Sequence, residues 1–248
     1  MKSCSFLPAT LLSMFLFCMV SCGGQNDQKD KGTFDSVAND TTTTTTITPT
    51  PSTIVASPQN MMVVRHKVAD FDKWLTSYEA HDSFRLANGV NSYLIGRSVT
   101  DPNMILVATK VDDIEKAKAF GKSSDLKQAM QKGGVTGKPV INLTTMTYQD
   151  TGKLSSDLRS QTTFRVKDWD HWQRSFDSSR QVRLDNGLID RAYGHDADDN
   201  KKVTVVVAVT DIAKANAFWK SDQLKQLRAR SGAIGKPEPF LFRVVKRY

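Results

Sequence analysis

The sequence predicts an α+β fold built from two tandem copies of one β-α-β-β-α-β module. Residues 65–150 and 163–248 align without a gap at a constant offset of 98 positions, and 29 of the 86 aligned pairs are identical. Both copies show the same order of strand and helix patterns, and in both the third strand is almost continuously apolar. Because a gapless alignment keeps every loop length, the two copies are expected to share one fold.

Four short motifs carry the alignment, and each marks the start or the end of an element. Asp-aromatic-Asp-x-Trp opens the first helix, Arg-Leu-x-Asn-Gly closes it, Asp-Ile-x-Lys-Ala opens the second helix, and Gly-Lys-Pro precedes the last strand. The paired segments are 70–74 with 168–172, 85–89 with 183–187, 113–120 with 211–218, and 137–139 with 235–237.

In the first copy, a mostly apolar strand is expected over residues 62–68, with a helix directly after it. Asp70 is a residue type that caps helix N-termini, and Asp72 in the first turn suits the helix dipole. The helix is expected to end at Asn88-Gly89, because glycine accepts the left-handed conformation that follows many helices. The elements expected next are strands 90–98 and 104–110, a helix opened by Asp113 and restarted at Ser123 as far as Met130, and a last strand over 140–148.

The third strand of each copy predicts how the two modules meet. A nearly continuous apolar run over 104–108, matched by 203–209, is typical of a strand buried on both faces. The helices of one module cover only one face of its sheet, so the other face needs a partner. The second module supplies it, and residues 61–248 are expected to form a monomer with an internal pseudo-dimer.

These motifs resemble those of the dimeric α/β-barrel superfamily, and within it the antibiotic-biosynthesis-monooxygenase-like proteins. The resemblance covers both modules and implies that each is ferredoxin-like, with the two sheets paired face to face as an intrachain dimeric α/β barrel. It also implies a ligand cavity between sheet and helices. The residues that carry it are 70–74, His81 with Arg85 and Gly89, 101–103, and 119–126.

The first 21 residues are typical of a lipoprotein signal peptide. Lys2 precedes an apolar stretch over 6–20 that is short for a membrane-spanning helix. The segment 19–22, Met-Val-Ser-Cys, resembles the bacterial lipobox, which implies that Cys22 is acylated and becomes the mature N-terminus. By the sorting rule of such proteins, Gly23 implies the outer membrane. The sequence therefore predicts an exported protein that is anchored in the bilayer of the cell envelope.

The remaining domain boundaries follow from composition. Residues 22–60 are polar and contain an unbroken threonine run over 41–46, so they cannot bury enough apolar surface to fold and are expected to form a disordered tether. Module one is then residues 61–150, a linker spans 151–162, and module two is residues 163–248.

Composition also excludes several kinds of chemistry. No cysteine follows Cys22, so the folded part has no disulfide and no thiolate nucleophile. The four histidines are His66, His81, His171 and His195, and no two have ligand spacing on one helix, so neither metal nor cofactor is expected. The net charge is +8, but the sequence contains no basic cluster with interleaved aromatic residues. No nucleic-acid partner is therefore expected.

Module one contains a candidate site. Trp74, Tyr78, His81 and Arg85 are spaced by four, three and four residues, which places them on one stripe of the first helix. His66 alternates with Val64 and Val68 on the first strand, so it shares their face. If that face meets the helices, His66, His81 and Arg85 converge on one cavity, with Trp74 and Tyr78 as its apolar wall.

Module two replaces most of this candidate site. Phe164 stands at the position of His66, Phe176 at that of Tyr78 and Ser179 at that of His81, while Arg183 keeps the position of Arg85. Any ligand is therefore expected in module one. A purely structural role for these residues stays open. In that reading His66 and His81 find hydrogen-bond partners within the fold and Arg85 forms a salt bridge. The retention of an arginine at position 183 favours this reading.

Two functions remain possible on this basis. The first is a non-catalytic lipoprotein that binds a small apolar or anionic ligand, or a protein partner. The second is an enzyme similar to cofactor-independent monooxygenases, in which His66 or His81 deprotonates an aromatic substrate and Arg85 stabilises the oxyanion. A haem-binding variant with an axial histidine is a third, lesser alternative.

Overall fold

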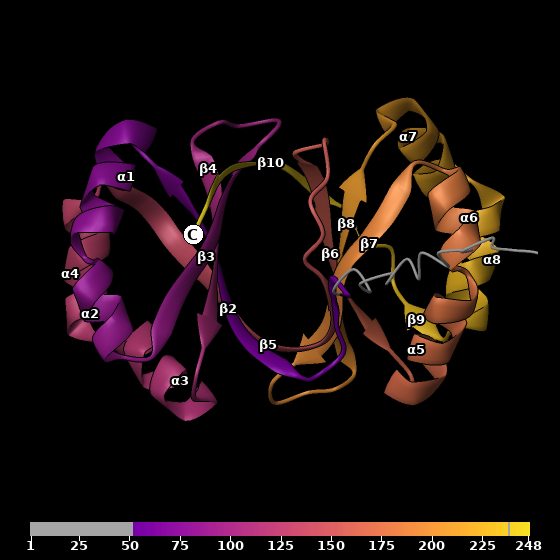
Figure 1. Cartoon of the computed structure of the whole chain (residues 1–248), viewed down its shortest axis with the longest axis horizontal. Coiled ribbons are helices and arrows are strands. Elements are labelled where there is room, and N and C mark those ends of the chain that lie inside the picture. The colour runs from indigo at the N-terminus through magenta and orange to yellow at the C-terminus, as the bar shows by residue number, and fades with distance from the viewer. Residues whose placement is uncertain (1–51, 238) are drawn as a thin grey trace, which may run out of the picture. The chain divides into compact units, whose positions relative to one another are not determined.

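Each half of the chain folds into four long strands and one two-residue strand, with helices packed on one side of the four-stranded sheet as predicted (Figure 1). The computed structural model describes residues 52–237 and 239–248. The elements of the first half are β1 (Ile54–Val55), β2 (Gln59–Val68), α1 (Phe71–Ala80), α2 (Asp82–Ala87), β3 (Val90–Ser98), β4 (Met104–Val111), α3 (Ile114–Lys122), α4 (Ser124–Lys132) and β5 (Val135–Asp150). Those of the second half are β6 (Leu158–Val166), α5 (Trp169–Ser178), α6 (Arg180–Asp185), β7 (Leu188–Asp196), β8 (Lys202–Val209), α7 (Ile212–Lys220), α8 (Asp222–Arg230), β9 (Ala233–Ile234) and β10 (Phe240–Arg247).

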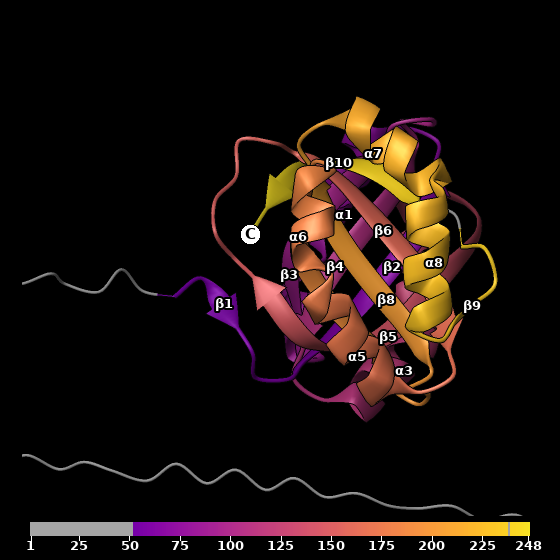
Figure 2. The same cartoon turned by 90° about the vertical axis from the view of Figure 1, so that its right-hand side faces the viewer.

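Eight of these strands close into one antiparallel barrel. The strand order is β5-β2-β4-β3 in module one and β10-β6-β8-β7 in module two. β3 pairs with β10 and β5 pairs with β7, so the strand edges of the two modules join at two seams. The helices lie outside the barrel, on opposite sides of it (Figures 1 and 2). The predicted α+β class with tandem ferredoxin-like modules is confirmed, and hydrogen-bonded edges join the modules in addition to the expected contact between faces.

A glycine lies beside each seam, at matched positions of the repeat. A Cβ added to Gly194 on β7 would lie under 3.0 Å from backbone atoms of Thr145 and Met146 on β5. A Cβ added to Gly96 on β3 would lie under 3.0 Å from the ring of Phe242 on β10. Both seams therefore depend on a residue that has no side chain.

The helix starts and the third strands agree with the sequence prediction. The side chains of Asp70 and Asp113 accept hydrogen bonds from the backbone three residues further on, at 2.8 and 2.9 Å. Along β4, Ile105 and Val107 pack toward the helices, while Leu106 and Ala108 belong to the cluster inside the barrel. The third strand is thus buried on both faces, as its composition predicts.

The first helix of each module is broken, although the sequence predicted a continuous one. His81 separates α1 from α2 with φ −99° and ψ 17°, and Ser179 separates α5 from α6 with φ −96° and ψ 15°. The helix pair still ends at the predicted place, where Gly89 has φ +66°. Hydrophobic spacing alone did not reveal the break, because the apolar stripe continues across it.

Three further boundaries differ from the prediction. β6 begins at Leu158, inside the predicted linker 151–162, because its first residues pair with β10 and β8. β5 begins at Val135 and not at residue 140, because Gly137, with φ +73°, carries the chain through an irregularity in the β2–β5 ladder and keeps its start paired with β2. The predicted tether, residues 22–60, includes β1 and the first two residues of β2, which pair with the end of β5. These residues gain backbone hydrogen bonds from β5, a partner that composition does not reveal.

The predicted signal peptide, residues 1–21, the acylation site at Cys22 and the tether as far as residue 51 lie outside the described residues. Among the helices of residues 52–237 and 239–248, none has the length and apolar character needed to cross a membrane.

Candidate functional site

A cavity of about 70 Å³ lies between the sheet and the helices of module one. It is bounded by β2 and β4 on the sheet side and by the four helices of the module on the other, and its walls are almost entirely apolar. The five predicted site residues all line it: His66, Trp74, Tyr78, His81 and Arg85. The structure thus brings together every residue that the stripe and strand patterns placed on one face.

His66 is buried without a hydrogen-bond partner. Its side chain is 4% exposed, and neither Nδ1 nor Nε2 meets a donor or acceptor among the described residues. The ring packs edge-on against Trp74, with 5.6 Å between ring centroids. Burial disfavours the charged imidazolium and lowers the pKa of His66 to about 4. At neutral pH the ring is therefore uncharged, and both its nitrogens are unsatisfied.

We expect His66 to make the protein less stable as the pH falls from 6.5 toward 4. In this range the imidazole of the unfolded chain binds a proton and the buried one does not, so protonation favours unfolding. The shift corresponds to a loss of about 3 kcal/mol across the range. Urea unfolding at pH 7 and pH 4.5 should show this loss of stability in the native chain, and His66→Phe should lack this contribution. An equal pH dependence in both proteins would contradict the assignment.

The polar end of the cavity is a stack of three side chains on the helix pair. Trp74 stacks on Tyr78 at 5.1 Å, and the guanidinium of Arg85 lies over the Tyr78 ring at 3.6 Å. Arg85 is 5% exposed and donates to the carbonyl of Tyr78 and, at 2.9 Å, to the carboxylate of Asp82. Its Nε is buried and has no partner among the described residues. The Tyr78 hydroxyl bonds Ser92 on β3 at 2.8 Å.

His81 lies at the break between α1 and α2. Its Nδ1 is 2.7 Å from the carbonyl oxygen of Ser77, and a carbonyl only accepts, so this nitrogen carries a proton. In the neutral ring, Nε2 is then the nitrogen with a free lone pair. His81 is therefore a second imidazole, besides His66, with an unpaired base nitrogen at this cavity.

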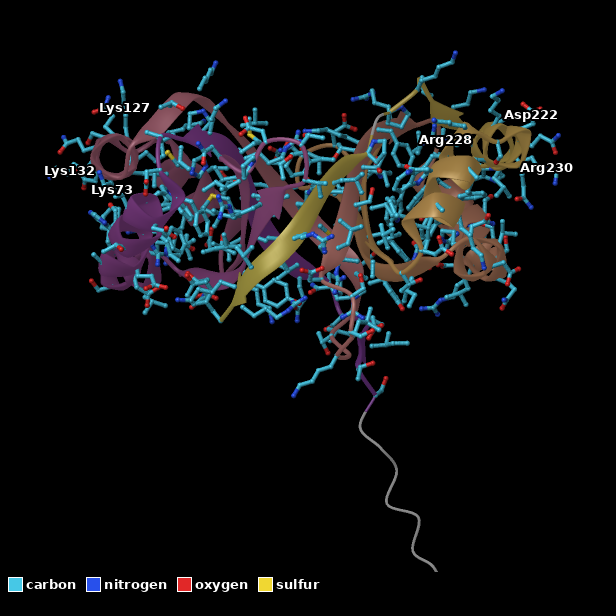
Figure 3. All side chains as sticks on the ribbon, turned by 90° about the horizontal axis from the view of Figure 1, so that it is seen from above. Lys73, Lys127, Lys132, Asp222, Arg228 and Arg230 are labelled. Atoms are coloured by element: carbon cyan, nitrogen blue, oxygen red, sulfur yellow. The ribbon has the colours of Figure 1, made fainter. Side chains whose placement is uncertain are left out.

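Module two keeps a cavity at the equivalent place, of about 110 Å³. It is the larger of the two cavities. Phe164 packs against Trp172 where His66 packs against Trp74, so the second cavity has no imidazole. The cavity is instead lined by Ser160, whose hydroxyl is buried without a partner, and by Arg228, whose pKa is lowered by burial. Arg228 lies on α8, far from module one (Figure 3).

The arginine that both copies share is paired differently in each. Arg183 donates from Nε and Nη2 to both carboxylate oxygens of Asp190, at 2.7 and 2.6 Å, and Asp190 is 3% exposed. The position of Asp190 holds Ser92 in module one, where Arg85 instead bonds Asp82 on its own helix. The sequence analysis missed this exchange, although comparing residues 98 positions apart would have revealed it.

The described residues do not favour a bound metal. No three His, Cys, Asp or Glu side chains of residues 52–237 and 239–248 come close enough to hold a metal ion together. The module-one cavity, at about 70 Å³, is also much smaller than the roughly 300 Å³ at which ligand pockets usually begin. A ligand of ordinary size therefore requires this cavity to widen.

Comparison with known proteins places the chain by its fold. No protein-family model and no curated protein sequence matches it. A candidate monooxygenase from Fusobacterium nucleatum matches with a TM-score of 0.50 and 12% identity, over 76% of this chain and 93% of its own. An anthrone oxidase-like protein matches with a TM-score of 0.54 and 15% identity, over 79% and 95%. A candidate chlorite dismutase gives 0.49 and 14%, over 76% and 95%. The chain has the dimeric α/β-barrel fold of these neighbours.

Proposed function

We propose that this protein is an exported lipoprotein that binds a small, mostly apolar ligand in the module-one cavity. The observation that supports this most directly is His66, which is buried beside an apolar cavity and has no partner for either ring nitrogen among residues 52–237 and 239–248. A buried polar group without a hydrogen bond costs about 1–3 kcal/mol. Phe164 fills the matched place in module two, so the fold itself does not require an imidazole there.

The cavity dimensions define the class of ligand. Most of its wall is apolar, and the polar side chains in it are those of His66, Ser77, Tyr78, His81 and Arg85. The ligand we propose therefore carries an apolar body and one polar or anionic group. Engineered cavities of roughly 150 Å³ hold benzene, so the present 70 Å³ must widen before a ring enters. The break at His81 is the point in the cavity wall where helix α2 can move relative to α1.

Benzyl alcohol and benzoate test the proposal, because each joins a ring to one polar group. We expect His66→Phe to weaken binding of the better probe by about tenfold or more, since one buried hydrogen bond is lost. Titration calorimetry would measure the affinity, and NMR shifts of the histidine rings would show whether the probe binds in the module-one cavity. Phe164→His in module two is the matched control and should leave this affinity unchanged. Equal binding by the native chain and His66→Phe, or no binding of either probe, would contradict the proposal.

The second candidate function is oxidation of an aromatic substrate by oxygen without a cofactor. Two solved structures of the same fold are a candidate monooxygenase and an anthrone oxidase-like protein. General bases work best with a pKa near the working pH, which His66 does not have. His81 is the candidate base in this reading, because its contact with the Ser77 carbonyl keeps the proton on Nδ1 and leaves Nε2 as the accepting nitrogen at the same cavity.

Oxygen uptake with anthrone separates the two candidates. If the protein is an enzyme, His81→Ala should lower turnover by about a hundredfold, the lower end of the usual contribution of a general base. His66→Phe should then change the Michaelis constant more than the turnover number. Uptake no faster than in buffer would leave binding as the function.

The anchoring part of the proposal rests on Cys22. The segment that ends at this residue has a lipobox-like pattern, and no cysteine follows it. We expect Cys22→Ala to move the protein from the membrane fraction to the soluble fraction, because two or three acyl chains would be lost. Metabolic labelling with a palmitate analogue should give no signal in this variant. Unchanged membrane association without the label would disprove the anchor.

A further inference from the structure

The interior of the barrel holds a cavity that is separate from the site proposed above. It has a volume of about 70 Å³ and lies on the inner face of the strands, away from the helices. Module one supplies its apolar wall, which includes Met61, Val63 and Leu106. Module two supplies a charged wall, with Arg159 on β6 and Arg191 on β7. The cavity therefore has a mainly apolar lining in which module two contributes the cationic side chains and module one contributes one carboxylate, that of Asp150.

Arg159 is a buried cation without a carboxylate partner. It is 4% exposed and forms no ion pair among the described residues. Its Nη1 donates to the carbonyls of Ser156 and Leu158 at 2.8 and 2.9 Å, and its other two guanidinium nitrogens meet no acceptor there. A buried charge is normally paired, because the cost of leaving water is large. Nε and Nη2 are not fully enclosed, so an acceptor from solution can reach them.

Other cations surround Arg159. Burial lowers the pKa of Arg159 to about 10, and the positive charges of Arg191 and Arg247 add to the effect. Asp150 is the acidic residue of the cavity wall, and it is already engaged by Arg191 at 2.9 Å and by Thr53. The three arginines also line an open groove of about 520 Å³ along the linker between the modules. The groove gives solutes a route from solvent to the arginines.

The repeat shows that the fold does not need these charges. The positions of Arg159, Arg191 and Arg247 hold Met61, Tyr93 and Gln149 in module one, and these residues line the same cavity. A cluster that costs stability and that the other copy lacks calls for a ligand of opposite charge.

We propose that Arg159, Arg191 and Arg247 bind an oxyanion, the carboxylate or phosphate group of a small solute, at the boundary of the barrel cavity and the linker groove. Arg159 and Arg247 have N–H donors without an acceptor among the described residues, and such donors match the paired oxygens of an oxyanion. Arg191 adds its positive charge, although its two Nη atoms already donate to Asp150 and to the carbonyl of Gly152. Its apolar remainder, if it has one, would contact Met61 and the module-one wall.

Phosphate and citrate are the probes, titrated into the full-length protein in a buffer of weakly bound ions. We expect both to raise the melting temperature, and Arg159→Met, which copies the module-one residue, to weaken binding about ten- to a hundredfold. Without the anion, this variant should melt higher than the native chain. Arg247→Gln, at the exposed rim, should weaken binding without altering the fold. Arg165→Met, at an exposed ion pair on the same strand, is the matched control and should stay within about twofold.

The source of the oxyanion is resolved by a vesicle arm. Sedimentation with phosphatidylglycerol vesicles that falls on Arg159→Met and Arg247→Gln, with no response to soluble phosphate or citrate, would assign the site to a lipid headgroup. A response to soluble anions would assign it to a solute. Equal responses of the native chain, Arg159→Met and Arg247→Gln in all three assays would overturn the proposal.

Discussion

Replacement of Asp190 by serine is expected to lower the free energy of unfolding by about 3–5 kcal/mol. Asp190 and Arg183 form a buried, bidentate ion pair in which both side chains are less than 10% exposed. Removing the carboxylate leaves a buried guanidinium with an unmet charge, which costs much more than the pair itself contributes. Serine is the residue that module one has at this position, so the substitution adds no bulk.

The repeat supplies a control for this prediction. Module one accommodates Ser92 at this position because the Tyr78 hydroxyl forms a hydrogen bond with it, and because Arg85 pairs with Asp82 instead. A triple variant with Phe176→Tyr, Arg180→Asp and Asp190→Ser would copy that arrangement into module two and should recover at least half of the loss. Urea unfolding of the native chain, the single variant and the triple variant measures both steps. A single variant as stable as the native chain would show that Arg183 is not paired as described.

Gly194→Val is expected to cost at least about 3 kcal/mol, at or beyond the upper end of the overpacking range. The added Cβ would meet backbone atoms of Thr145 and Met146, which cannot turn aside as a side chain can. The β5–β7 seam must then separate, and the barrel opens along two strand edges. Exposed edges pair with other copies, so this variant should dimerise or aggregate in analytical ultracentrifugation, whereas we expect the native chain to be a monomer.

Gly96→Val at the other seam is the matched comparison. There the obstacle is the ring of Phe242, a side chain, so Phe242→Ala combined with Gly96→Val should restore the seam in part. No second substitution of this kind can rescue Gly194→Val, because its obstacle is backbone. A native-like melting temperature and a monomeric Gly194→Val would show that the seam tolerates a side chain.

Local periodicity explains why five site residues were predictable. Helical spacing places Trp74, Tyr78 and Arg85 on one face, and strand alternation places His66 with Val64, so both faces are readable without tertiary information. The break at His81 was not readable, because a cap that lacks a side-chain hydrogen bond leaves no residue signature. It did not disturb the convergence, since the stripe continues on α2.

The interior arginines were not predictable from either module alone. Alternation along β6 places Arg159 on the opposite face to Ser160, but what that face meets depends on which strand edges join. The pairing of β10 with β3 and of β5 with β7 follows from barrel closure, a long-range property. The pairing of Arg183 with Asp190 was not predicted for another reason. These residues lie seven positions apart and meet only because the chain turns from helix α6 into strand β7 between them.

Fusing the two copies releases the barrel from symmetry. In a barrel made by two identical chains, each substitution occurs twice, so an arginine at the position of Arg159 would face a second arginine at that of Met61. Two such buried cations in one cavity would repel each other. One chain with two diverged halves can keep methionine on one wall and arginine on the other. Covalent linkage thus allows the two halves of the barrel lining to carry different charges, which the symmetry of a homodimer forbids.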